Sequence, residues 1–185
     1  MIFNDHHKLQ GLHAPFGASQ CAWLNYDIEK ALTVYNNMKA KEMGSRLHAW
    51  AKETIDLGLK QPRSKKTIYT YVNDAIGYKM KTEVVLFYSP YFFGTADAIS
   101  FRNNVLRIHD LKTGKTAVHI EQLMIYAALF CLEYKIDPAD IQTELRIYQS
   151  DDILCHCPDP DEIKAIMNKI IYLDRALAQI DGEEA

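Results

Sequence analysis

The spacing of hydrophobic residues is helical over the first third of the chain. After an irregular stretch at 1–26, apolar side chains recur every three or four positions over residues 27–41 and again over 44–57. This spacing predicts two helices with a break between them. The basic segment 60–66 predicts a linker, and residues 67–78 predict a third helix.

The pattern then changes to alternation, with many β-branched and aromatic residues. Residues 82–88, 92–101 and 105–111 are each predicted to form a strand, and residues 102–104 supply a hairpin turn. Strands joined by such short connections pair antiparallel. The middle of the chain therefore predicts a three-stranded antiparallel sheet.

The last third of the chain predicts two helices around one more pair of strands. Residues 118–134 are apolar almost all round, so we expect a buried helix. Residues 141–149 predict a fourth strand, which residues 153–157 extend or pair with, and residues 161–180 predict an amphipathic helix. A strand reached through a helix indicates a crossover connection. The predicted fold is α/β: a mixed sheet with helices on its faces.

Composition narrows the class of protein only slightly. The 185 residues are 48% hydrophobic and 24% charged, which is typical of one globular domain. The net charge of −3 excludes a protein that wraps nucleic acid over its whole surface, but it leaves room for a local phosphate-binding patch.

The ends and apolar runs of the sequence predict a cytoplasmic protein. The beginning of the chain has no apolar run after a basic start, so we expect no signal peptide. No stretch approaches about 18 consecutive apolar residues, so we expect no membrane span. The four cysteines are too few for a disulfide framework and are expected to be reduced.

Two carboxylates and a lysine fall at the ends of paired strands. Asp110 and Lys112 lie two residues apart and so point to the same face of their strand, and Asp97 lies on the neighbouring strand. Carboxylates bind Mg²⁺ or Mn²⁺, and an ammonium group stabilises developing negative charge, as phosphodiester hydrolysis requires. By spacing alone the pattern is weak, because a surface ion pair at a strand end looks the same.

Four motifs in a fixed order make the pattern more specific. They are Gly44-Ser45-Arg46-Leu47-His48, Gly94-Thr95-Ala96-Asp97, Ile108-His109-Asp110-Leu111-Lys112-Thr113-Gly114 and Gln122-Leu123-Met124-Ile125-Tyr126. In kind and order they resemble the G-x-x-x-H, G-x-x-D, D-x-K-T-G and Q-x-x-x-Y motifs of the PD-(D/E)XK nuclease superfamily. The resemblance is to its RecB-like and Cas4-like branch, including small phage exonucleases, and it covers residues 44–149.

The resemblance implies a restriction-endonuclease-like core, αβββαβ, in a single nuclease domain. Residues 1–43 would be an N-terminal extension, 44–157 the catalytic core and 158–185 a C-terminal helix. The implied activity is metal-dependent hydrolysis of DNA, with Mg²⁺ or Mn²⁺ as cofactor. It fits an exonuclease in phage-type recombination, repair or DNA processing, and a bacterial host cytoplasm if a phage encodes the chain.

The resemblance also assigns roles to individual residues. His48, Asp97, Asp110 and the backbone carbonyl of Leu111 would hold the metal, and Lys112 would be the catalytic lysine. The two remaining residues, Gln122 and Tyr126, would line the site.

Several of these residues have plainer interpretations. His48 shares an amphipathic helix with Trp50 and could be structural. Gln122 and Tyr126 lie one helical turn apart, so they could serve the neighbouring sheet instead of a site. Glu83 is a reserve metal ligand, Glu53 is expected to point elsewhere, and His119 stays unassigned.

The cysteines suggest a second kind of metal centre only weakly. Cas4-like proteins hold an iron–sulfur cluster with one upstream and three downstream cysteines. Here Cys21 lies upstream, and Cys155 and Cys157 flank His156 downstream, one cysteine short and at the wrong spacing. We therefore expect no cluster, and ordinary thiols fit better than a zinc site. Cys131 is expected in the core.

Three functions remain open on the sequence. The first is a DNA nuclease, with a recombination or annealing protein as a further partner and an oligomer compatible with it. In that case the segment 60–66 is the first candidate for phosphate contact, although most charge runs are simply solvated. The second is a catalytically silent nuclease fold that binds DNA or a protein, and the third is a small zinc or redox protein.

Overall fold

The computed structural model describes residues 5–9, 11–114 and 117–183. The chain divides into two compact units, Met1–Ser45 and Arg46–Ala185. Helix α1, Ile28–Asp56, begins in the first unit and ends in the second.

The first unit consists of short helical turns and the start of α1. The turns are η1, His7–Leu9, and η2, Cys21–Asn25, within the stretch that the sequence predicts to be irregular. The indole N–H of Trp23 donates a hydrogen bond to the carbonyl of Gly17 at 3.0 Å. The predicted break between two helices near residue 43 is wrong, because α1 continues through Gly44. One glycine costs a helix interior only about 1 kcal/mol.

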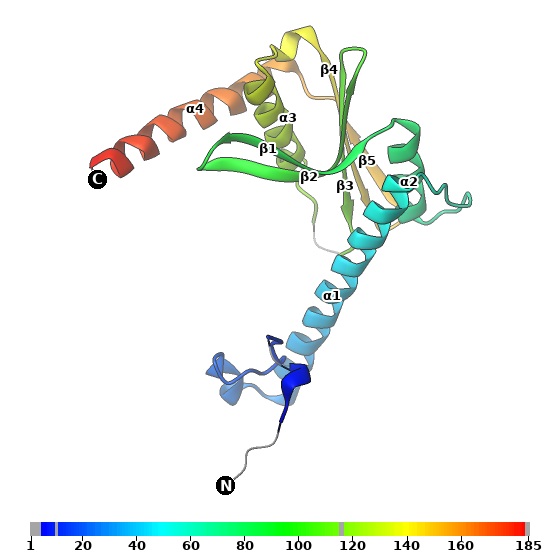
Figure 1. Cartoon of the computed structure of the whole chain (residues 1–185), viewed down its shortest axis with the longest axis vertical. Helices are drawn as coiled ribbons and strands as arrows, with labels where there is room; N and C mark the ends of the chain where they lie inside the picture. The colour runs from blue at the N-terminus through cyan, green and yellow to red at the C-terminus, as the bar shows by residue number, and fades with distance from the viewer. Residues whose placement is uncertain (1–4, 10, 115–116, 184–185) are drawn as a thin grey trace. The chain divides into compact units, whose positions relative to one another are not determined.

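The second unit contains the end of α1 and all the remaining elements. In chain order these are α2 (Thr67–Gly77), β1 (Lys81–Ser89), β2 (Phe92–Arg102), β3 (Val105–Lys112), α3 (Glu121–Tyr134), η3 (Pro138–Asp140), β4 (Gln142–Gln149), β5 (Asp152–His156) and α4 (Pro160–Glu183). The five strands form one sheet in the order β1-β2-β3-β4-β5 (Figure 1).

The sheet is mixed, as the sequence predicts. Strand β3 pairs antiparallel with β2 and parallel with β4, while β1 and β5 pair antiparallel with their neighbours. The parallel pair is the one that α3 connects. The turn between β2 and β3 contains Asn103 and Asn104, both with positive φ, which is what a two-residue hairpin of the type I′ class requires.

Helices cover both faces of the sheet. On one face the core contains buried residues of α3, α4 and the sheet, such as Leu123, Ala127 and Ile163. On the other face Ala51 of α1 and Val72 of α2 join a second cluster with residues of β2, β3 and β4. Strand β3 contributes to both clusters, so it lies between two dry layers, and the protein is a mixed α/β fold.

Helix α3 begins later than its apolar pattern predicts. The prediction started the helix at residue 118, whereas α3 begins at Glu121 and the residue before it, Ile120, makes no side-chain cap. Hydrophobic periodicity continues into the preceding loop because Val118 and Ile120 pack against the core without being helical. Within the described ranges, no helix is both long and apolar enough to cross a membrane.

Candidate active site

The pairing of β2 with β3 brings Asp97 and Asp110 opposite one another. The last recorded pair of the two strands is Ala98 with His109, and Asp97 and Asp110 are the next residues outward. Beyond this pair the backbone hydrogen bonds between the two strands end. The backbone N–H of Leu111 instead donates to the Asp97 side chain, to Oδ2 at 3.0 Å.

The strands β1 and β2 are irregular at the level of Asp97. Pairing runs from Thr82↔Ala98 to Val84↔Ala96 and omits Glu83 and Asp97, and Glu83 has a φ of +50°. Ala96 packs in the α3-side core, whereas Ala98 packs in the α2-side core. Strict alternation would put both on one face, so the alternation breaks at Asp97. This irregularity, which period-two reasoning cannot detect, decides where the Asp97 carboxylate points.

A series of polar contacts joins β3 to α3. Lys112 Nζ lies 3.0 Å from Asp110 Oδ2 and donates to Gln122 Oε1 at 3.0 Å. The Gln122 amide N–H then donates to the Tyr126 hydroxyl at 3.1 Å. Gln122 therefore contacts Lys112 at the end of β3, a contact that fits both a site residue and a residue that serves the neighbouring sheet.

Asp97 is held in an environment that disfavours its charge. Burial, followed by the nearby Asp110 carboxylate, raises its pKa to about 6, while the Leu111 N–H and His48 act in the opposite direction. His48 Nδ1 lies 3.5 Å from Asp97 Oδ2. The α1 histidine and the β2 aspartate, 49 positions apart in the sequence numbering, therefore meet.

The donor set fits a hard divalent cation. Asp110 Oδ2 is buried and accepts no hydrogen bond with the required geometry from any described residue, although Lys112 Nζ is near it. A cation between the two carboxylates would satisfy this oxygen and offset their repulsion. In the part of the chain that the structure describes, no three His, Cys, Asp or Glu side chains already form a ready-made metal site.

The backbone carbonyl of Leu111 is expected on the same side of β3 as the Leu111 N–H group. In a strand, the N–H and the C=O of one residue point toward the same neighbouring strand. Because the Leu111 N–H reaches Asp97 on β2, we expect its carbonyl to lie on that side too. Its side chain is buried in the α2-side core, which fixes the backbone.

Gly94 is required by the ring of Tyr126. A Cβ added at Gly94 would come within 2.8 Å of Tyr126 Cε1, closer than such contacts normally occur. The glycine of the G-x-x-D motif therefore lets an α3 aromatic ring lie directly on strand β2, and this ring in turn holds the hydroxyl that Gln122 contacts.

Tyr71 of α2 lies near the carboxylates and was missed by the sequence analysis. Burial, and then the negative charges of Asp97 and Asp110, raise its pKa far above the ordinary value. Glu83 also acts on the pKa of Asp97, and its side chain is exposed. The only sequence signal at Tyr71 is its position on the apolar stripe of α2. That signal indicates a core residue and not a site residue.

Other candidates from the sequence lie elsewhere. His119 is exposed, precedes α3 rather than lying on its face, and approaches Glu121 at 3.9 Å. Glu53 is exposed on α1. Cys155 in β5 and Cys157 just after it are exposed, and Cys131 is buried in α3.

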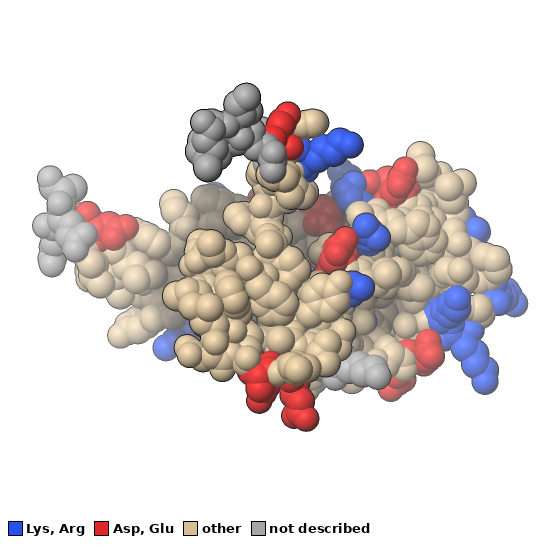
Figure 2. Space-filling model, turned by 90° about the horizontal axis from the view of Figure 1, so that it is seen from below, with Lys and Arg blue, Asp and Glu red and all other residues tan. Residues whose placement is uncertain are grey.

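The basic linker forms an exposed, irregular segment. Its residues from 60 to 66 precede α2, and the side chain of Asn73 anchors it through hydrogen bonds with the backbone of Gln61 at 2.8 and 3.0 Å. Figure 2 shows Lys and Arg side chains gathered at the right of the view, the side on which Figure 1 draws this segment. Lys115, next to the D-x-K-T-G motif, lies outside the described residues.

Fold and site together define a mixed α/β protein with a carboxylate–lysine cluster at a strand irregularity. The chain belongs to the family described as "Protein of unknown function (DUF2800)", whose model matches residues 37–150. The matched segment includes every residue of the site. No curated protein and no solved structure matches the chain.

Proposed function

We propose that the chain is a metal-dependent nuclease with a PD-(D/E)XK core that hydrolyses phosphodiester bonds of DNA. Two observations support the fold part of this proposal: the element order around the mixed sheet and the parallel pairing of β3 with β4. Both agree with the αβββαβ core that the motifs imply.

The observation that carries the proposal is the contact series from Asp110 through Lys112 and Gln122 to Tyr126. These residues belong to two separate motifs and to two different elements. A surface ion pair at a strand end would not need a glutamine from a helix to bind the lysine, whereas a positioned catalytic lysine would.

The metal would be held by the carboxylates of Asp97 and Asp110, with His48 and the Leu111 carbonyl as further ligands. When bound, a divalent ion supplies Lewis-acid polarisation of the phosphoryl oxygen and a more acidic water. Mg²⁺ and Mn²⁺ are the ions expected from oxygen-rich ligands.

The protein's own residues orient the reaction. The Lys112 ammonium, a third exposed, can donate to the non-bridging oxygen of the scissile phosphate while Gln122 fixes its direction. Tyr126 holds Gln122 through its hydroxyl, so it is a positioning residue rather than a catalytic one. The Leu111 N–H orients Asp97.

The finer part of the proposal rests on the resemblance alone. It favours an exonuclease acting in phage-type recombination, repair or DNA processing, in the cytoplasm and beside a recombination or annealing protein. The competing function is a catalytically silent nuclease fold that binds DNA or a protein.

The test is cleavage of linear and circular DNA, single- and double-stranded, with Mg²⁺ or Mn²⁺. Wild type, Lys112→Ala and a control, Lys169→Ala on the exposed side of α4, are compared at equal folded concentration. We expect cleavage that needs the metal, is lost in Lys112→Ala and persists in the control. Dependence on free ends would identify an exonuclease.

Two results would contradict the proposal. Equal cleavage by wild type and Lys112→Ala would mean that a contaminant or another site does the chemistry. Absence of cleavage of all four substrates with both metals would favour the silent module.

A further inference from the structure

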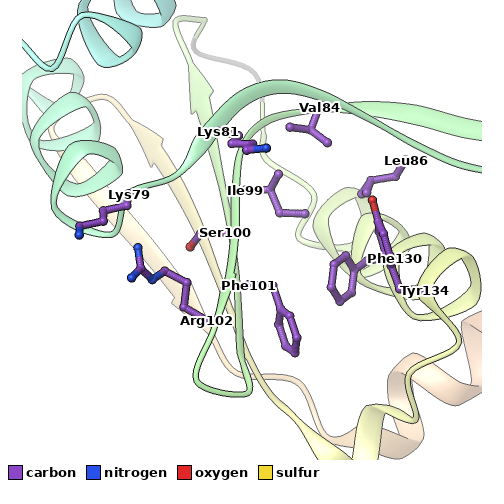
Figure 3. A pocket seen from close by; sticks show the side chains of 10 residues that line it. All are labelled: Lys79, Lys81, Val84, Leu86, Ile99, Ser100, Phe101, Arg102, Phe130 and Tyr134. Carbon is purple, nitrogen blue, oxygen red and sulfur yellow. The ribbon is translucent and has the colours of Figure 1, made fainter.

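A hollow lies at the end of β2 away from Asp97. It has a volume of about 310 Å³, at the lower end of small-molecule sites, and Figure 3 shows the side chains around it. Its lining residues come from β1, β2, α3 and the turn after α2: Lys79, Lys81, Val84, Leu86, Ile99, Ser100, Phe101, Arg102, Phe130 and Tyr134.

The hollow exists because β1 is shorter than β2 at this end. Lys81 pairs with Ile99, and this is the last pair between the two strands, so residues 100–102 have no partner on β1. The open edge of β2 therefore forms part of the wall, and side chains from both faces of the strand reach the hollow. Neither Asp97 nor any other residue of the candidate active site lines it.

The rim of the hollow is basic. Lys79, Lys81 and Arg102 are exposed, and within the described residues no ion pair links any of them to a carboxylate. Lys79 and Arg102 also line an adjoining hollow, together with Arg107. Among the described residues that line these two hollows there is no Asp or Glu, so both favour an anion.

The opposite wall is aromatic. Phe101 packs against Phe130 in a tilted arrangement with ring centroids 5.2 Å apart, and Phe130 packs in the same way against Tyr134 at 4.8 Å. Phe130 is buried, whereas 39% of Phe101 and 53% of Tyr134 remain exposed. Exposed rings held by a buried one form a stable surface on which a flat ligand can stack.

A buried hydroxyl between the two walls lacks a partner. Ser100 is only 8% exposed, and its Oγ makes no hydrogen bond with any described residue. In Figure 3 its hydroxyl points to the side on which Lys79 and Arg102 lie. Ser100 therefore adds a polar group to the wall between the cations and the rings.

We propose that this hollow binds a nucleoside phosphate, with the phosphate at Lys79, Lys81 and Arg102 and the base on Phe101 and Tyr134. Phosphate needs the cations and the base needs the exposed rings, and the hollow offers both within one small volume. The site is separate from the proposed catalytic one: Phe130 lies eight residues beyond Gln122 on α3, which is about 12 Å along the helix axis.

The ligand could be a free nucleotide or one unit of a single strand, and the experiment separates the two. Binding of thymidine monophosphate, of a short single-stranded oligothymidylate and of inorganic phosphate is measured by calorimetry in EDTA. Without metal no cleavage takes place, so the result does not depend on the proposed nuclease activity.

The variants remove the cations and the ring surface separately. We expect Lys81→Ala/Arg102→Ala to weaken binding of both nucleotide probes about tenfold or more. The matched variant Lys169→Ala/Arg175→Ala, which removes the same charge from the exposed side of α4, should change it much less. Tyr134→Ala should weaken nucleotide binding at least about fivefold while leaving inorganic phosphate unchanged.

Monophosphate binding as tight as oligonucleotide binding identifies a free nucleotide, and tighter oligonucleotide binding identifies a strand. The proposal is overturned if the two double variants behave alike, if Tyr134→Ala weakens phosphate and nucleotide equally, or if wild type binds neither nucleotide.

Discussion

Adjacent residues of β3 belong to two different polar networks on opposite faces of the sheet. The site network comprises Asp97, Asp110, Lys112, Gln122 and Tyr126. The α2-face network comprises five other residues: Asp74, Tyr78, His109, Arg146 and Tyr148. Asp110 and His109 are neighbours in sequence, yet strand alternation sends their side chains to different environments.

The α2-face network balances its charges. Arg146 pairs with Asp74 at 3.0 Å, and the Tyr148 hydroxyl donates to the same carboxylate at 2.7 Å. His109 is neutral, because burial and the nearby Arg146 and Arg107 lower its pKa to about 3. Each charged group has an opposite partner, as expected of a scaffold.

The site network does not balance its charges in the same way. Lys112 pairs with Asp110 and stays partly open to solvent, whereas Asp97 lies beside His48 and its pKa is raised by burial and by the Asp110 carboxylate. Buried polar residues therefore do not mark a site by themselves. What distinguishes a site is an excess of like charge with an opening, which a scaffold avoids.

The largest expected effect comes from removing one charge of the site network. Asp97→Asn keeps an oxygen for the Leu111 N–H but weakens the metal site, so we expect DNA cleavage to fall at least about 100-fold. The free energy of unfolding should not fall, because the repulsion with Asp110 is removed. Cleavage kinetics and urea unfolding check both, and a large loss of stability would mean that Asp97 is mainly structural.

Removing a charge from the α2-face network should have the opposite result, a loss of stability with unchanged cleavage. Asp74→Ala leaves Arg146 and the Tyr148 hydroxyl without their shared acceptor, so we expect unfolding to become easier by about 2 kcal/mol. Activity per folded molecule should stay close to wild type. An Asp74→Ala protein that is stable but inactive would erase the distinction between the networks.

A smaller effect is expected from changing the contact between Gly94 of β2 and the ring of Tyr126. Gly94→Ala should push Tyr126 away and loosen Gln122 and Lys112, lowering the cleavage rate about tenfold. Tyr126→Phe keeps the ring and removes only the hydroxyl, so it should cost a few-fold in rate. Gly94→Ala and Tyr126→Ala combined should be no worse than Tyr126→Ala alone; additive losses would show that Gly94 acts elsewhere.

The smallest effect is expected from one hydroxyl of the α2-face network. Tyr148→Phe preserves the buried ring but removes the donor to Asp74 and the contact with His109 Nδ1 at 3.2 Å. We expect a loss of about 1 kcal/mol in urea unfolding with unchanged cleavage. A change in cleavage without a change in stability would link this network to the chemistry.

Local patterns in the sequence predicted most of the secondary structure. Alternation located β1 to β4, and the parallel crossover followed from the helix between β3 and β4. The break assigned near Gly44 was wrong because a single glycine interrupts a helix only weakly.

The site was predicted from motifs and not from spacing. Residues close in sequence, such as Asp110 and Lys112, could be paired from strand geometry. His48 and Gln122 could be placed only through the resemblance, because their contacts depend on tertiary packing. The irregularity at Glu83 and Asp97 and the hollow around Ser100 arise from how strands end and bend, which hydrophobic periodicity does not encode.

The most direct test of the central claim is Mn²⁺ binding, because it does not depend on choosing the right DNA substrate. Calorimetric titration of wild type, Asp97→Asn, Asp110→Asn and the exposed control Asp140→Asn is compared at one pH. We expect a Mn²⁺ site in wild type and in Asp140→Asn, weakened at least about tenfold in the other two variants. Equal Mn²⁺ affinity in all four proteins, or no binding by wild type, would contradict the account.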